Sequence, residues 1–204
     1  YDKESLYKKY RISPEKNLVL LLAGAHGVLK NMKEICETLL LSTNYQLAVV
    51  CGKNHSLKNE LAHLTTRYYD RFHCFGYIER IDELSRLANV MVTKPGGITL
   101  TEATATSTPL ILYKPVPGQE KENALFFSQK GAALIANNQE DLLLSIESLL
   151  VDKQKHSSLQ SSIKKLNLPA SQEVIMTDIL KESEKIGRIH SSSIIRSQKK
   201  KLGT

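Results

Sequence analysis

The hydrophobic positions of the chain form short uninterrupted runs that alternate with longer amphipathic segments. Apolar runs without polar alternation are typical of strands that are covered on both faces. The pattern predicts six such strands, at residues 18–23, 46–50, 71–75, 90–92, 109–113 and 132–135. Helical periodicity follows the glycine-rich segments at 24–27 and 96–97 and recurs at residues 57–68, 80–88, 121–130 and 141–151. Because strands and helices alternate, we expect an α/β fold with a parallel sheet and helices on both of its faces.

A polar loop follows the predicted strand at 90–92, where Lys94-Pro-Gly96-Gly97 leads into a helix. Adjacent glycines allow a sharp turn, and the N–H groups at the start of a helix are suited to a shared anion such as phosphate. Thr99 can add a hydroxyl donor, and Glu102, one turn further on, can accept from a ribose diol. The alternatives are a plain strand-to-helix turn for the glycines and a helix-dipole contact for Glu102. The ligand interpretation predicts a nucleotide diphosphate site.

A second polar loop, residues 114–120, follows the predicted strand at 109–113 and precedes a helix. It ends in Gly118-Gln-Glu-x-x-Asn123, where Gln119 and Glu120 can bond the hydroxyls of a hexose, because an amide both donates and accepts and a carboxylate accepts twice. The carboxyl ends of parallel strands meet at one edge of a sheet, where open α/β sheets bind ligands. The two loops together therefore predict a nucleotide-sugar site.

The segments TKPGGITLTEA and PGQEKENA, together with AGAHGVLKN, VVCGKN and GYIERIDEL, resemble the C-terminal half of family 28 glycosyltransferases of the GT-B fold. The resemblance runs from about Leu18 to Glu184 and is strongest to the branch that glucosylates diacylglycerol in Gram-positive bacteria. Plant galactolipid synthases and the peptidoglycan GlcNAc transferase are more distant. It implies a Rossmann-like domain that binds the sugar donor.

The resemblance also implies individual roles. Gly96, Gly97 and Thr99 fall on the phosphate-contacting loop, Glu102 on the ribose-binding glutamate, and Ile78 on the segment whose backbone meets uracil. Tyr77 either stacks near uracil or packs in the core, and His26 either donates to the pyrophosphate or fixes its own loop. The complete predicted donor site is Gly24, His26, Gly27, Tyr77, Ile78, Lys94, Gly96, Gly97, Thr99, Glu102, Gln119, Glu120 and Asn123.

The activity that the resemblance implies is inverting, processive transfer of glucose from UDP-glucose to diacylglycerol and then to glucosyl-diacylglycerol. The products are glycolipids and an anchor for lipoteichoic acid. We expect no metal or other cofactor, because backbone amides and hydroxyls would stabilise the departing pyrophosphate. A GT-B UDP-sugar epimerase and a non-catalytic nucleotide-sugar-binding module are the alternatives. Motifs of dinucleotide-binding dehydrogenases and of P-loop nucleotidases are not present in the sequence.

The resemblance further implies a division of the chain. We expect a linker-proximal segment at 1–16, a UDP-sugar-binding domain at 17–168, a helix at 169–186 that crosses back to the N-terminal domain, and a basic disordered tail at 187–204. The N-terminal acceptor domain, with the general base, lies outside this chain. We therefore expect the chain alone to be inactive.

Charge is concentrated at one end of the chain. Six of the 28 Lys and Arg residues lie in residues 185–204, which hold no acid, so 22 basic residues face 21 acidic ones in the rest. This tail is either solvated and disordered or attracted to anionic lipid.

The sequence has no stripe of basic residues interleaved with aromatic ones, so we expect no nucleic-acid partner. Cys36, Cys51 and Cys74 lack metal or redox spacing, and no apolar run spans a bilayer. We expect a peripheral protein at the cytoplasmic face of the cell membrane.

Overall fold

The computed structural model describes residues 2–23 and 31–167, and within them six strands form one parallel sheet in the order β3-β2-β1-β4-β5-β6. The strands are β1 (Leu18–Leu22), β2 (Gln46–Val50), β3 (Phe72–Phe75), β4 (Val90–Thr93), β5 (Leu110–Tyr113) and β6 (Ala133–Ala136). The helices are α1 (Lys3–Tyr10), α2 (Met32–Ser42), α3 (His55–Arg67), α4 (Ile81–Leu87), α5 (Gly97–Thr106), α6 (Gln119–Gln129), α7 (Gln139–Val151) and α8 (Lys153–Leu166). The predicted parallel α/β sheet is confirmed.

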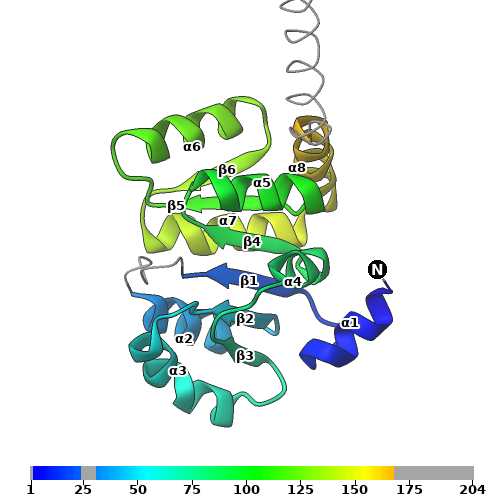
Figure 1. Ribbon diagram of the computed structural model, residues 1–204, viewed down its shortest axis with the longest axis vertical. Helices are drawn as coiled ribbons and strands as arrows, with labels where there is room; N and C mark the ends of the chain where they lie inside the picture. The colour runs from blue at the N-terminus through cyan, green and yellow to red at the C-terminus, as the bar shows by residue number, and fades with distance from the viewer. Residues whose placement is uncertain (1, 24–30, 168–204) are drawn as a thin grey trace, which may run out of the picture. The chain divides into compact units, whose positions relative to one another are not determined.

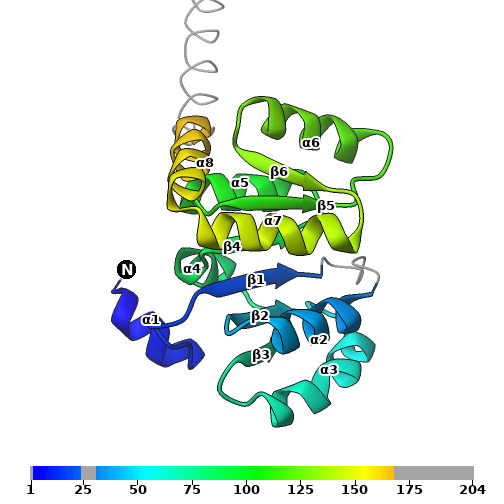
Figure 2. The same ribbon diagram turned by 180° about the vertical axis from the view of Figure 1, so that it is seen from behind.

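Helices cover both faces of this sheet, which is why the strand sequences are mostly apolar and lack a regular polar alternation. In Figures 1 and 2, α4 and α5 lie on one face, and α2 and α7 lie on the other. The central strands β1 and β4 pair in parallel with Leu20 opposite Met91, and both side chains are fully buried. Side chains from strands and covering helices form one continuous core.

The order of the strands creates a switch point between β1 and β4. From β1 the chain builds outward through β2 and β3, and then returns to the other side of β1 to build β4, β5 and β6. Loops after β1 and β4 therefore leave the sheet in opposite directions, and the crevice between them is where sheets of this kind bind ligands. The loops that follow β4 and β5 lie at this carboxyl edge.

Two helices were not predicted from the sequence. The first, α1, occupies half of the segment predicted as linker-proximal, and it is capped by Asp2, whose side chain accepts hydrogen bonds from the amides of Glu4 and Ser5. Its apolar residues are few, but Leu6 and Tyr10 are both buried. Tyr10 donates a 2.7 Å hydrogen bond to Glu83 on α4, and Lys9 donates to the same carboxylate. The largely polar sequence of α1 gave no helix signal, and the helix docks through its buried side chains and the Lys9–Glu83 ion pair.

The second unpredicted helix, α8, has a strongly polar sequence with apolar residues at a single helical spacing. Asp152 caps its first turn by accepting from the amide of Lys155 at 2.9 Å, and Leu159 and Ile163 are buried. His156 Nε2 donates to the carbonyl of Asn89, just ahead of β4, at 2.9 Å. This contact fixes α8 at the amino edge of the sheet.

Several predicted elements lie outside the described residues. These are the glycine-rich loop with Gly24, His26 and Gly27, the crossing helix at 169–186 and the tail at 187–204. Within the described part, helix boundaries differ from the predicted ones by up to two residues. The difference has consequences at α6, because Gln119 and Glu120 were expected in a loop and instead form the first turn of the helix.

Candidate functional site

The first loop of the site connects β4 to α5 and ends in two exposed glycines. Gly96 is the residue before the helix, and its backbone is extended, with φ −76° and ψ 138°. A Cβ atom built on Gly96 or Gly97 would meet nothing within 4 Å, and neither has a positive φ. The sequence predicts that these glycines allow a sharp turn, and the observed turn does not depend on glycine at either position. Neither packing nor backbone conformation requires them, and their lack of a side chain leaves open space in front of the first amides of α5.

The residues after the glycines lie on the first two turns of α5. Thr99 is partly exposed. The hydroxyl of Thr101 donates to the carbonyl of Gly97 at 2.9 Å, so its hydrogen is engaged within the helix. Glu102 is partly buried, and its burial, reinforced by the nearby Asp82 carboxylate on α4, raises the pKa of its carboxyl. A hydrogen-bond donor placed against Glu102 would relieve this cost, and the hydroxyls of a ribose are such donors.

The predicted uracil segment follows β3, which is the outermost strand on its side of the sheet. With strands about 4.8 Å apart, β3 lies roughly 14 Å from β4, across β2 and β1. The following helix closes this distance, because α4 packs against α5 and brings the segment toward Glu102. Tyr77 is 71% exposed, whereas Ile78 packs partly against the core. Tyr77 is thus available to a ligand, and the alternative of core packing does not hold for it.

The second loop runs from Lys114 to Gly118 and precedes α6. Gly118 has φ +98° and ψ −144°, which side-chain-bearing residues rarely adopt, so glycine is required here. Gln119 is exposed and unobstructed in the first turn of α6. Glu120 accepts from the amide of Val116 at 3.1 Å through Oε2, and Asn123 donates to the carbonyl of Pro95 at 2.9 Å. Glu120, predicted to bind the donor sugar, and Asn123, predicted as part of the donor site, thus also hold this loop in place.

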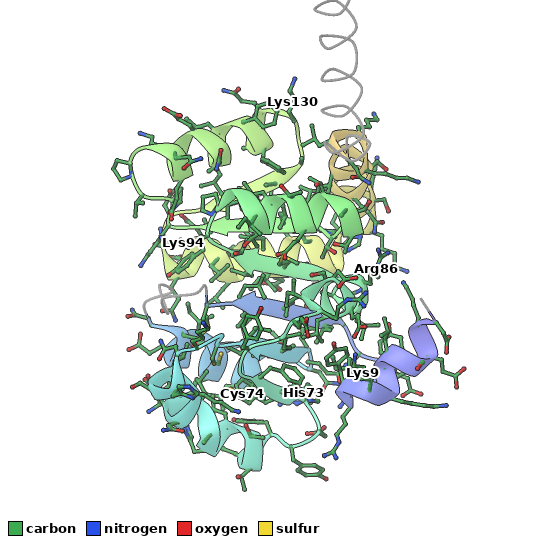
Figure 3. The ribbon with its side chains drawn as sticks, viewed as in Figure 1. Lys9, His73, Cys74, Arg86, Lys94 and Lys130 are labelled. Carbon is green, nitrogen blue, oxygen red and sulfur yellow. The ribbon has the colours of Figure 1, made fainter. Side chains whose placement is uncertain are left out.

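The structure therefore brings two of the predicted groups directly together. The first and second loops follow neighbouring strands and contact each other, and the uracil segment joins them through α4. Lys94, at the beginning of the first loop, lies at the carboxyl edge (Figure 3). Sequence reasoning missed Asp82, which perturbs Glu102, because nothing in the pattern shows that α4 packs on α5. Gly24, His26 and Gly27 belong to a loop outside the described residues.

Other chemistry in the described part of the chain is sparse. Within residues 2–23 and 31–167, no three His, Cys, Asp or Glu side chains gather as a metal site. No helix of the same ranges is long and apolar enough to cross a bilayer. Cys36 and Cys51 are buried, and Cys74 is only partly buried. Burial raises the pKa of the Cys36 thiol.

Comparison with known proteins identifies the family. Residues 2–166 match the family model described as glycosyl transferases group 1. The chain belongs to this glycosyltransferase family. It is 56% identical over 183 residues to the processive diacylglycerol β-glucosyltransferase of Bacillus licheniformis. The aligned residues make up 90% of this chain and 48% of that protein. The glycosyltransferase chain thus spans about half the length of the curated relatives it matches, and the predicted resemblance is confirmed.

Solved structures confirm the predicted fold. The crystal structure of Anabaena HepE in complex with UDP and glucose matches 90% of this chain and 52% of its own, with a TM-score of 0.66 and 17% identity. A UDP-N-acetylglucosamine 2-epimerase matches 72% of this chain and 38% of its own, with a TM-score of 0.56 and 19% identity. Because transferases and an epimerase share this fold, the fold alone does not decide the reaction.

Proposed function

We propose that this glycosyltransferase chain is the donor-binding half of an inverting enzyme that transfers glucose from UDP-glucose to diacylglycerol, and then to glucosyl-diacylglycerol. The observation that carries the proposal is the pairing of two loops at the carboxyl ends of β4 and β5, one open over the first amides of α5 and one ending in Gln119 and Glu120. The name of the Bacillus relative supports the choice of diacylglycerol as the acceptor.

In the proposed complex, the pyrophosphate lies in front of Gly96 and Gly97, where helix N–H groups and the positive end of α5 stabilise its charge. The ribose lies at Glu102 and the base near Tyr77 and Ile78. Gln119 and the outward oxygen of Glu120 receive the hexose. As the glycosidic bond breaks, negative charge develops on the leaving UDP, and preorganised amides stabilise it without a metal ion.

Titration calorimetry with UDP, UDP-glucose, UDP-galactose and ADP-glucose tests the donor assignment. The proposal expects saturable binding of the uridine ligands, with ADP-glucose at least about tenfold weaker, because a segment that reads the uracil edge through its backbone would not match adenine. Equal affinity for ADP-glucose would contradict the uracil assignment. A folded chain that binds none of the four would contradict the donor site itself.

Turnover in the full-length protein tests the reaction. UDP-glucose and dispersed diacylglycerol should give mono- and diglucosyl-diacylglycerol, with no loss of rate when a chelator is added. If the protein epimerises UDP-N-acetylglucosamine and forms no glycolipid, the proposed transfer reaction is wrong and the enzyme is an epimerase. Binding of nucleotide sugars with neither product would identify a binding module.

We also propose that the full-length protein works as a peripheral enzyme on the cytoplasmic face of the membrane, since its acceptor would be a membrane lipid. Cosedimentation with vesicles of neutral and of anionic lipid tests this. Binding that rises with the anionic fraction and falls with salt is expected for contact through basic residues. Equal binding to both vesicle types would refute the electrostatic part of the proposal.

A further inference from the structure

The two donor loops are joined by a set of contacts that centres on Lys94. Its ammonium group donates to the main-chain carbonyl of Lys114, the first residue after β5. It also lies 3.8 Å from Oε2 of Glu120, in the first turn of α6. The side chain of Lys94 is only 14% exposed and that of Glu120 is 29% exposed. This ion pair is therefore shielded from solvent and is weakened less by salt than a surface pair would be.

A second contact runs in the opposite direction between the same loops. Asn123, one turn beyond Glu120 on α6, donates to the carbonyl of Pro95, the residue after Lys94. The amide of Val116 closes the arrangement by donating to Oε2 of Glu120. The first loop thus reaches the second through Lys94, and α6 reaches back through Asn123. The distance between the two loops cannot change without breaking at least one of these bonds.

The backbone of the second loop is shaped for this contact. Lys114 has φ +46°, in the left-handed region that residues other than glycine seldom occupy. Its carbonyl is the one that accepts from Lys94. Glu120 has one oxygen, Oε2, committed to Val116 and Lys94, so Oε1 is the oxygen available to a ligand. Val116 and Lys94 together therefore hold Oε2, and Lys94 is the side chain that ties this carboxylate to the first loop.

We infer that Lys94 is a positioning residue that sets donor-sugar selectivity by fixing the Glu120 carboxylate and the spacing between the phosphate loop and the sugar loop. This inference rests on the proposed function. It assigns Lys94 to the sugar end of the site rather than to the phosphates, because its ammonium is turned toward Lys114 and Glu120. Loss of Lys94 should weaken recognition of the hexose and leave recognition of UDP largely intact.

The test compares the affinities of UDP and UDP-glucose by calorimetry in Lys94→Met, Lys94→Arg and a matched control, Lys121→Met. Methionine keeps the length and apolar stem of lysine and removes its charge. Lys121 is an exposed lysine next to Glu120 whose side chain makes none of these contacts. We expect Lys94→Met to lower the affinity for UDP-glucose about tenfold or more and that for UDP less than about threefold. Lys94→Arg should recover most of the loss, and Lys121→Met should resemble the unmodified chain.

A double-mutant comparison separates positioning from a direct contact. Glu120→Gln leaves Lys94 in place and should also weaken UDP-glucose selectively, and the combination with Lys94→Met should cost little more than either change alone. Losses that multiply would overturn the inference, as would an equal loss of UDP and UDP-glucose, which would place the ammonium on the phosphates. Unchanged affinities in Lys94→Met would overturn it as well.

Two further outcomes keep the result interpretable. Circular dichroism melts establish that each variant is folded, and if Lys94→Met is not, Glu120→Gln alone tests the role of the carboxylate. If the unmodified folded chain binds neither UDP nor UDP-glucose, the proposed function fails. If it binds both and the selectivity of Lys94→Met is unchanged, the proposed function stands and the role of Lys94 is refuted.

Discussion

Replacement of Gly97 by alanine adds one methyl group and should affect folding stability and ligand affinity in opposite directions. Gly97 is the first residue of α5, its φ is not positive, and an added Cβ would meet no atom of the chain within 4 Å. Alanine is the better helix former, and it restricts the unfolded chain, which together favour the folded state by about 0.4–1 kcal/mol. We therefore expect Gly97→Ala to be as stable as the unmodified chain or slightly more stable.

Binding should respond in the opposite direction. A methyl group in front of the first amides of α5 would push a pyrophosphate away from N–H groups that otherwise bond an ionised oxygen. One such bond is worth about 1.5–3 kcal/mol, so the affinities for UDP and UDP-glucose should both fall by roughly tenfold to a hundredfold. Urea unfolding followed by circular dichroism measures the stability, and calorimetric titration measures the affinities.

Gly131→Ala is the matched control for this experiment. Gly131 has φ +65°, and an added Cβ would lie 3.5 Å from Oγ of Ser162 on α8. Alanine there should cost about 1–2 kcal/mol of stability and leave the affinity for UDP unchanged, which is the reverse of the Gly97 result. The reasoning is refuted if Gly97→Ala binds UDP within about twofold of the unmodified chain, or if it destabilises the fold by more than about 1 kcal/mol.

Three further predictions concern groups at and around the site. Burial raises the pKa of the Glu102 carboxyl, so at pH values just above its ordinary pKa of 4.5 it binds more protons in the folded than in the unfolded state, and its contribution to stability falls as the pH rises through that window. Ribose hydroxyls favour the charged carboxylate, so UDP binding near pH 5 should release a proton. The release would appear as a binding enthalpy that depends on the buffer, and Glu102→Gln should abolish it. Tyr10→Phe should lower the free energy of unfolding by about 1 kcal/mol in urea titrations, because it removes the hydrogen bond to Glu83. Unchanged stability would mean that α1 docks by apolar packing and the Lys9–Glu83 ion pair without help from this hydrogen bond. Ile163→Ala should lower the free energy of unfolding by about 2–4 kcal/mol, since this side chain of α8 is fully buried, whereas a loss below about 0.5 kcal/mol would show that α8 adds little to the core.

The strands and the helices after the glycines were predictable because burial on both faces leaves a simple signal. Helix α1 was not, since its stability depends on Glu83, a residue more than 70 positions away. The same limit applies to α8, whose polar sequence has only one apolar stripe. At the site, the motif predicted which residues lie in the first loop, but a sequence cannot show that the φ angles of Gly96 and Gly97 are ordinary.

The contacts within the site were equally beyond sequence reasoning. Glu120 was predicted to bind the sugar and Asn123 to belong to the donor site, and only the structure shows that they also bond Val116 and Pro95. The perturbed pKa of Glu102 arises from burial beside Asp82, which depends on the placement of α4 against α5. Residue types were thus predictable from the motifs, and their electrostatic environment was not.

The attachment of α8 at the amino edge has a practical consequence for measuring this protein. His156 holds the helix to Asn89, just ahead of β4, while both donor loops leave the opposite ends of the strands. Four strand residues separate the two edges, or about 13 Å. A fluorophore or a biotin attached to an exposed residue of α8, such as Lys153 or Ser157, would therefore lie at the opposite edge of the sheet from these loops. The chain can be immobilised on a sensor surface by this helix with its donor loops facing the solution.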